Sequence, residues 1–235
     1  MDTQKVDQRA PHQVMQITQL RAHPLRMLVV FGTPLLFATT GFLHLLAWPS
    51  GSETEIYTKL RDHATLWIAI HIVQLLLILL LAVAVYWLTE GLTGTAARVS
   101  RAALLPYLVF YSAFDSIVGL SRGLLAHYGS QLSSARQAAL PGVVDALFNH
   151  VNHPVPFTFG LIGSWSWAVA AAAAAVALRQ AGAPWTATIP LGLAGVIGAI
   201  DHAPPYGPIA MALFLIAAGL LSRPPRRAVL QPGPA

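Results

Sequence analysis

The sequence predicts an all-α integral membrane protein, a bundle of about six transmembrane helices, and three observations support this class. Hydrophobic residues make up 55% of the 235-residue chain, charged residues only 10%, and the mean hydropathy is +0.60. Soluble domains carry about 25% charged residues. Long apolar runs recur along the chain, most of them near the roughly 20 residues that cross a bilayer. The short segments that flank these runs carry most of the positive charges, as in multi-pass membrane proteins.

The apolar runs divide the chain into three regions. We expect an N-terminal arm over 1–24, a single transmembrane domain over 25–222, and a basic, proline-rich tail over 223–235. Within the connection between the third and fourth spans, Pro141 suits the first turn of a short helix over about 142–152. The apolar side of that helix suits the membrane interface or the end of the bundle. The six expected spans are about 25–48, 64–88, 104–127, 157–178, 185–200 and 206–222.

Positive charges in the short loops predict the orientation. Arginines precede span one, separate spans two and three, follow span four and follow span six; they include Arg26, Arg98, Arg101, Arg179 and Arg223. This alternation places both termini in the cytoplasm, in a plasma or inner membrane. The chain is basic, with pI ≈ 10.0 and net charge +5, but these charges flank the spans, so nucleic acid is not an expected partner. The expected partners are the lipid bilayer and a small-molecule or lipid ligand, and the sequence is compatible with an oligomer.

The third span, Leu104–His127, carries charge at membrane depth and is therefore expected at the centre of the bundle. Its sequence includes Asp115 near the middle and Arg122 about two turns later. A charge at the bilayer centre costs roughly 2.5–3.5 kcal/mol on insertion scales, so such residues face a bundle interior or a wet cavity. At helical spacing Tyr111, Asp115, Gly119 and Arg122 share one face. This face predicts a polar seam turned towards neighbouring helices.

The predicted orientation brings the histidines beyond the N-terminal arm to the outer half of the membrane. His63, Trp67, His71 and Gln74 share roughly one face of span two. From the outer boundary the helical rise places His44 about 6 Å deep, Arg122 about 8 Å, His71 about 10 Å and Asp115 about 18 Å. We therefore expect an outward-facing polar pocket with a lid from the outer connection and Asp201–His202. The expected lining residues are His44, His71, Gln74, Asp115 and Arg122.

The leading functional hypothesis is that this pocket binds a metal ion or haem. Imidazole and carboxylate ligate zinc, iron and copper, and the absence of cysteine leaves histidine and carboxylates as ligands. The candidate metal ligands are His44, His71, His150, His153 and His202; for haem, His44 and His71 are the candidates, with Gly41 and Gly119 making room. Asp115 and Arg122 are the candidate catalytic residues, Asp115 orienting a ligand or acting as a base and Arg122 holding an anionic group of a small or lipophilic substrate.

Two alternatives need no cofactor. The same side chains could form a proton relay or a substrate clamp, as intramembrane ionisable groups do in transporters, and histidine titrates near neutral pH. This predicts a small proton-coupled transporter or a pH-responsive sensor subunit. The other alternative is a structural membrane subunit, in which Asp115 and Arg122 hold helices together. No HExxH or Walker motif is present, so the sequence leaves open whether the protein is an enzyme.

Overall fold

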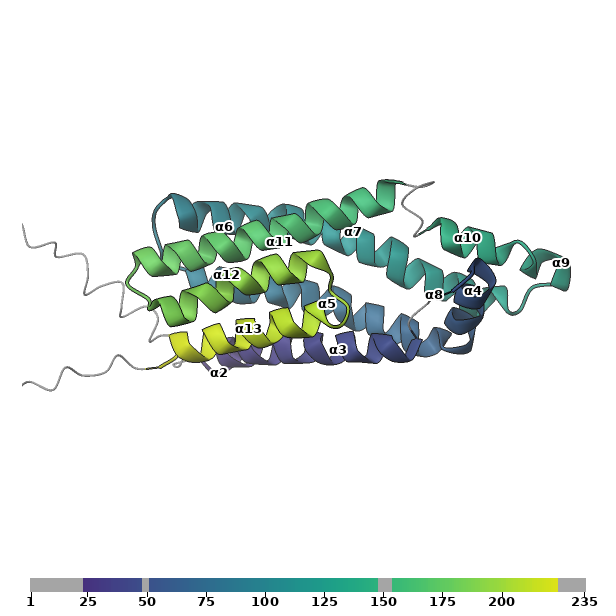
Figure 1. Cartoon of the computed structure of the whole chain (residues 1–235), viewed down its shortest axis with the longest axis horizontal. Coiled ribbons are helices and arrows are strands. Elements are labelled where there is room, and N and C mark those ends of the chain that lie inside the picture. The colour runs from purple at the N-terminus through teal and green to yellow at the C-terminus, as the bar shows by residue number, and fades with distance from the viewer. Residues whose placement is uncertain (1–22, 48–50, 148–153, 224–235) are drawn as a thin grey trace, which may run out of the picture.

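The computed structural model describes residues 23–47, 51–147 and 154–223, and these form an elongated bundle of helices (Figure 1). No strand occurs within these ranges. Four helical stretches are long and apolar enough to cross a membrane: Pro24–Leu46, Ala64–Thr89, Thr95–Gly129 and Pro154–Gln180. The all-helical class is confirmed, and the apolar stretches support a membrane-embedded protein.

The helices follow the expected order of spans. The first span contains α2 (Pro24–Met27), the π-helical turn η2 (Leu28–Gly32) and α3 (Thr33–Ala47). The short α4 (Glu53–Asp62) leads into α5 (Ala64–Thr89). The third span contains α6 (Thr95–Pro106), η3 (Tyr107–Tyr111), α7 (Ser112–Phe114), η4 (Asp115–Ser121) and α8 (Arg122–Gly129). The remaining helices are α9 (Ser134–Gln137), α10 (Leu140–Ala146), α11 (Pro154–Gln180), α12 (Trp185–Ile200) and α13 (Tyr206–Leu221).

The last two helices form a hairpin that is shorter than the rest of the bundle. α12 and α13 have 16 residues each, which corresponds to about 24 Å, less than the roughly 30 Å of a hydrocarbon core. Their connecting turn lies partway along the bundle, whereas α4, α8 and α10 extend well beyond it (Figure 1). Four long spans are therefore present, and the six-span arrangement stays a prediction.

The third span begins earlier than the sequence indicates. The segment 89–103 reads as a linker because it contains Arg98 and Arg101, yet α6 begins at Thr95. Arg101 donates to the backbone carbonyls of Thr89 and Leu92, at 2.8 and 3.2 Å, and so holds the turn that precedes α6. The other side of α6 packs on α11. A basic segment is thus helical because one of its faces is buried.

Two π-helical turns keep the polar residues of the third span on one face. Tyr107, Tyr111, Asp115, Gly119 and Gly123 are all buried, and they repeat every four residues. In a regular α-helix such a repeat drifts by about 40° per step, because a turn takes 3.6 residues. Each π-helical turn accommodates an extra residue, so η3 and η4 offset this drift. The shared face expected from the sequence is confirmed by this burial, and its cause lies in the π-helical turns.

One end of the bundle is closed by α4 and α10. Tyr57, Leu60, Leu140 and Val144 form a small apolar core there, together with Trp67 and Ala126. The helix expected at 142–152 is α10, which begins at Leu140 with Pro141 in its first turn. The end of that expected helix, 148–153, lies outside the described residues. Because α10 packs on α4 and α8, it covers the bundle end, and a membrane-interface role stays a prediction.

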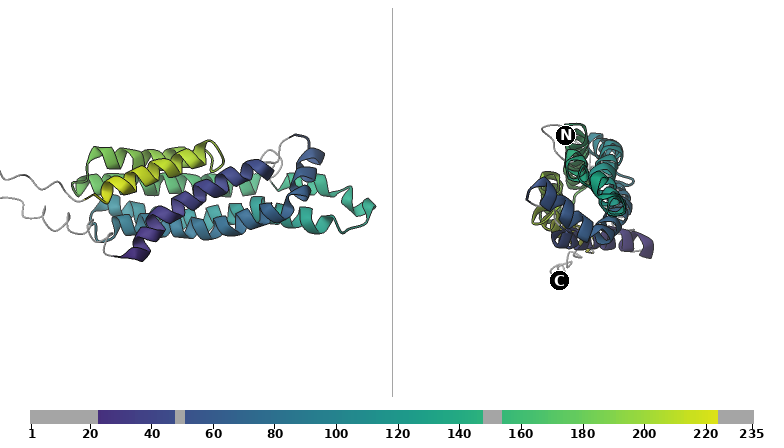
Figure 2. Two further views of the ribbon diagram at one scale, coloured as in Figure 1. Left: turned by 90° about the horizontal axis from the view of Figure 1, so that it is seen from below. Right: turned by 90° about the vertical axis from the view of Figure 1, so that its right-hand side faces the viewer.

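The opposite end of the bundle contains the start of α2 and the end of α13 (Figure 1). The α5–α6 and α11–α12 connections lie there too, and Arg26 pairs with Glu90 of the former. The first span crosses the bundle obliquely (Figure 2). The start of the first span and the end of the last therefore share one end, as expected, and their cytoplasmic side stays a prediction.

Candidate functional site: a buried imidazole pair in the bundle

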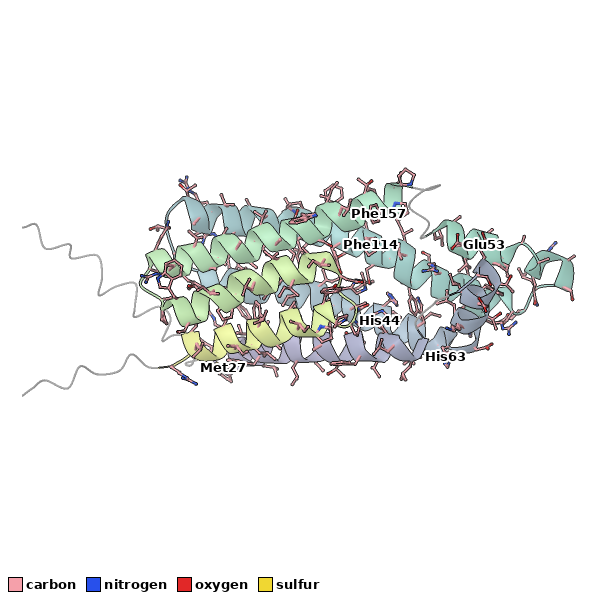
Figure 3. The ribbon with its side chains drawn as sticks, in the orientation of Figure 1. Met27, His44, Glu53, His63, Phe114 and Phe157 are labelled. Atoms are coloured by element: carbon pink, nitrogen blue, oxygen red, sulfur yellow. The ribbon has the colours of Figure 1, made fainter. Side chains whose placement is uncertain are left out.

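The candidate site lies where α3, α5, η4 and the α12–α13 turn meet, about halfway along the bundle (Figure 3). A cavity of about 80 Å³ occupies this position. One water needs about 10–15 Å³ by a comparable measure, so the cavity has room for several waters or a small ligand. Predicted site residues on its wall are His44, His71, Asp115, Arg122 and His202, and apolar side chains on its wall are Ile56, Trp67, Phe114 and Val118.

Two histidines from different spans face each other at the cavity. His44 Nδ1 lies 3.1 Å from the carbonyl oxygen of Thr40, and His71 Nδ1 lies 2.8 Å from that of Trp67. A carbonyl oxygen only accepts hydrogen bonds, so each ring carries a hydrogen on Nδ1. The Nε2 atoms of His44 and His71 then point at each other, 3.3 Å apart. Both imidazoles are buried.

The protonation of the two rings decides the nature of this contact. When the two imidazoles are neutral and carry hydrogen on Nδ1, each Nε2 presents a lone pair, and two lone pairs at 3.3 Å repel. A proton on one Nε2 turns the contact into a hydrogen bond, and a metal ion between the two atoms would also remove the repulsion.

The position of His71 is held by its neighbours on two helices. Trp67, one turn earlier on α5, donates from Nε1 to the carbonyl oxygen of Gly119 at 2.7 Å, which fixes α5 against η4. The Trp67 ring also packs on His71, with ring centroids 4.5 Å apart. Gly119 makes this approach feasible, because a Cβ built there would lie 1.8 Å from His71 Cδ2. A larger residue at 119 would displace the His71 imidazole.

A buried carboxylate lies beside the imidazole pair. Asp115 Oδ1 is 4.0 Å from His71 Nε2, and the Asp115 side chain is 4% exposed. Its Oδ2 atom is buried with no hydrogen-bond partner among the described residues. A buried charge is costly unless it is paired or ligates a metal ion. Asp115 therefore places an acidic side chain within 4.0 Å of the His71 imidazole.

The third histidine reaches the site from the α12–α13 turn. The His202 ring packs edge-on against His44, with centroids 5.6 Å apart. Its Nδ1 lies 3.5 Å from Asp201 Oδ1, so Asp201 orients the ring. Gly207 permits the tight turn, since a Cβ there would lie 1.8 Å from the carbonyl oxygen of His202. The glycine and proline residues after His202, which the sequence explains as a turn, place this imidazole.

The other predicted site residues are not brought to the cavity. Gln74 is 1% exposed and does not line it. His150 and His153 lie outside the described residues. Among residues 23–47, 51–147 and 154–223, no group of three or more histidine and acidic side chains has an arrangement that could hold a metal ion. A complete ligand set is therefore not confirmed; the pair and the nearby carboxylate are what the structure contains.

Haem fits this geometry poorly. Two imidazoles on opposite sides of one iron hold their nitrogens about 4 Å apart, given metal–nitrogen bonds of about 2 Å, and the porphyrin lies between the rings. His44 and His71 are closer than this and stand nearly perpendicular, at 86°. The two glycines expected to make room for haem contact protein groups instead: Gly119 faces His71, and Gly41 faces Pro208 and His202. The expected space for a haem is therefore absent between these two histidines.

Trp67 lines the cavity and positions both His71 and Gly119, but the sequence did not mark it as a site residue. One feature of the sequence could have indicated this role of Trp67. It lies one turn before His71 on the same helix face, where a side chain packs against the residue that follows it by one turn. Phe114, which packs on His202, carried no such signal. Comparison of the chain with protein families, with curated proteins and with solved structures gave no match.

Proposed function

We propose that this protein is a multi-pass membrane protein that binds a divalent transition-metal ion, such as zinc, iron or copper, at His44 and His71. The single observation that carries this proposal is the 3.3 Å separation of two Nε2 atoms whose partner nitrogens both donate to backbone carbonyls. Nε2 is then the atom of each ring that would coordinate the ion, and the Nδ1 hydrogen bonds fix ring orientation as they do in metal sites.

The distance between the nitrogens fits two ligands of one metal ion. Zinc–nitrogen bonds are about 2.0–2.1 Å long in a tetrahedral site, so two such ligands lie about 3.3–3.4 Å apart. The observed separation is 3.3 Å. The pair is therefore spaced as two ligands of one tetrahedral ion.

Asp115 is the proposed third ligand. Its Oδ1 lies 4.0 Å from His71 Nε2, about 0.7 Å beyond the separation of two ligands on one tetrahedral ion, so Asp115 would have to move towards the ion to coordinate it. Three protein ligands leave a fourth position for water, whose pKa a zinc ion lowers to about 7. Arg122 on the same cavity wall would hold an anionic group of a substrate, and His202 orients the site from the turn. On the positive-inside rule, the cavity faces the outer side of the membrane.

The test is the metal content of the protein purified in mild detergent. We expect about one metal ion per chain after reconstitution with Zn²⁺, and loss of that ion in His44→Ala and in His71→Ala. His63→Ala is the matched control, because His63 is exposed and its side chain makes no cap hydrogen bond. Equal metal content in the wild-type protein and in both site variants would refute the proposal.

A second function is favoured by one specific observation, that the buried Oδ2 atom of Asp115 has no hydrogen-bond partner in the part of the chain that the structure describes. In a proton-coupled transporter or pH sensor, protons would bind to Asp115 and to the imidazole pair without any metal. This alternative predicts wild-type folding in a chelator and pH-dependent proton uptake in vesicles that Asp115→Asn abolishes. A structural subunit predicts that Asp115→Asn alters assembly and leaves proton uptake unaffected. Metal-dependent folding would argue against both.

A further inference from the structure

The charged side chains divide unequally between the two ends of the bundle. The end that contains the α5–α6 and α11–α12 connections, here called the basic end, has five arginines and one glutamate among the described residues: Arg26, Arg98, Arg101, Arg179, Arg223 and Glu90. The end formed by α4, α9 and α10 has four carboxylates and three basic side chains: Glu53, Glu55, Asp62, Asp145, Lys59, Arg61 and Arg136. Arg26 pairs with Glu90, and within residues 23–47, 51–147 and 154–223 no carboxylate pairs with the other four arginines of the basic end. The basic end therefore has an excess of positive charge.

Two arginines of the basic end are held in position by backbone carbonyls. Arg101 Nη1 donates to the carbonyl oxygens of Thr89 and Leu92, and Arg179 Nη1 donates to that of Ala183 at 3.1 Å. A guanidinium has five N–H donors in a planar fork, so these bonds leave each side chain with donors for a further acceptor. The selection of membrane orientation requires only the number of positive charges. The carbonyl contacts, in contrast, fix where two of these charges lie.

Tryptophan side chains give the depth of the basic end in a membrane. Trp185 begins α12 and is 60% exposed, and the Arg179 guanidinium lies over its ring at 4.8 Å from the centroid. At the end of α5, Arg26 lies over the Trp87 ring at 5.4 Å. Tryptophan at the ends of membrane-spanning helices lies at the level of the lipid headgroups. The guanidinium groups beside these rings are therefore at the depth of the lipid phosphates.

We propose that the basic end binds anionic phospholipids, whose phosphate oxygens accept hydrogen bonds from Arg101 and Arg179. The planar fork of arginine matches a phosphate group, and basic clusters beside membrane helices attract anionic lipids. A zwitterionic lipid is attracted less, because its own cationic group offsets the phosphate charge. The opposite end of the bundle, with its excess of carboxylates, gives no such attraction. This lipid surface is independent of the proposed metal site and lies at a different place in the fold.

The experiment titrates the full-length protein in mild detergent with phosphatidylglycerol or with phosphatidylcholine of the same acyl chains, and native mass spectrometry counts the bound lipids. The site variant combines Arg98→Gln with Arg179→Gln, both exposed residues of the basic end. The matched control combines Lys59→Gln with Arg136→Gln, which removes the same charge from exposed residues at the opposite end. We expect the wild type to bind phosphatidylglycerol more tightly than phosphatidylcholine. The site variant should bind phosphatidylglycerol at least about fivefold more weakly than the wild type, and the control should bind it like the wild type.

Three results would overturn the proposal. Equal binding of the two lipids by the wild type would show that the basic end does not select anionic lipids, and an equal loss in the control variant would show an effect of net charge alone. Displacement of phosphatidylglycerol by excess inorganic phosphate would identify a site for free phosphate instead of a lipid. Should the site variant fail to fold, Arg179→Lys decides, because it retains the charge and loses the planar fork: weaker phosphatidylglycerol binding supports the proposal, and wild-type binding overturns it.

Discussion

Gly119→Ala tests the packing that positions the imidazole pair. A Cβ at position 119 would lie 1.8 Å from His71 Cδ2 and 2.4 Å from His71 Nε2. Carbon atoms in contact normally lie about 3.5–4.0 Å apart, so the ring or the helix must shift by roughly 2 Å. The ring has little room to move, because its Nδ1 is bound to the Trp67 carbonyl, the Trp67 ring packs on it, and its Nε2 edge meets His44.

Two costs follow from this shift. Overpacking destabilises a protein by about 1–3 kcal/mol, and breaking the His71–Trp67 hydrogen bond costs about 1 kcal/mol. Moving a metal ligand off its support weakens metal binding by about 10–100-fold. Gly119→Ala should therefore lower both the free energy of unfolding and the affinity for Zn²⁺.

The assay is thermal unfolding in detergent with and without Zn²⁺, together with a competition titration against a zinc-binding dye. Gly192→Ala on α12 is the control, since its nearest neighbour would be Ala175 Cβ at an ordinary 3.8 Å. That variant should be neutral or slightly stabilised by the better helix propensity of alanine. Wild-type stability and wild-type zinc affinity in Gly119→Ala would refute the account of how His71 is held.

Three further predictions concern single side chains. Trp67→Phe removes the donor to Gly119 and should cost about 1–3 kcal/mol in urea unfolding; an unchanged midpoint would show that the hydrogen bond contributes nothing. Gln74→Leu should leave stability unchanged or raise it by about 1 kcal/mol, because both amide atoms of Gln74 lack hydrogen-bond partners within the described residues; a clear loss would reveal a partner. Hydrogen bonds from the Ser52 backbone and hydroxyl lower the pKa of Glu55. The charged Glu55 carboxylate therefore stabilises the start of α4 at pH values above the ordinary glutamate pKa. This stabilisation is lost as the pH falls through the lowered pKa. An NMR titration of the Glu55 carboxyl measures its pKa, and hydrogen exchange of the α4 amides measures the stability of the helix start. Glu55→Gln should lack the pH dependence of that stability, and an ordinary pKa for Glu55 would contradict the prediction.

The sequence predicted the parts of this fold that depend on composition and period. Apolar run lengths located the long spans to within a few residues, except at the start of the third span, where arginines on one helix face concealed a continuing helix. The charged residues Asp115 and Arg122 correctly marked the buried face of that span. Its π-helical turns could not be read from the sequence, since they depend on how the helix packs against its neighbours.

The sequence predicted which residues form the candidate site, but not how their side chains are oriented towards one another. His44, His71, Asp115, Arg122 and His202 do meet at one cavity, because intramembrane polar groups avoid lipid. The direction of each Nε2 atom depends on a hydrogen bond to the residue four positions earlier, which spacing alone does not specify. Gln74 was predicted to line the cavity and does not, because a helix face shared by several residues is wider than the wall of a small cavity.

The most direct test of the central claim is zinc-edge X-ray absorption spectroscopy on the purified, zinc-reconstituted protein. The account predicts about one ion per chain with a ligand shell at about 2.0–2.1 Å that contains two imidazoles, and loss of imidazole scattering in His71→Ala. A protein that binds no zinc, or a zinc shell without imidazole, would contradict the claim that His44 and His71 hold a metal ion.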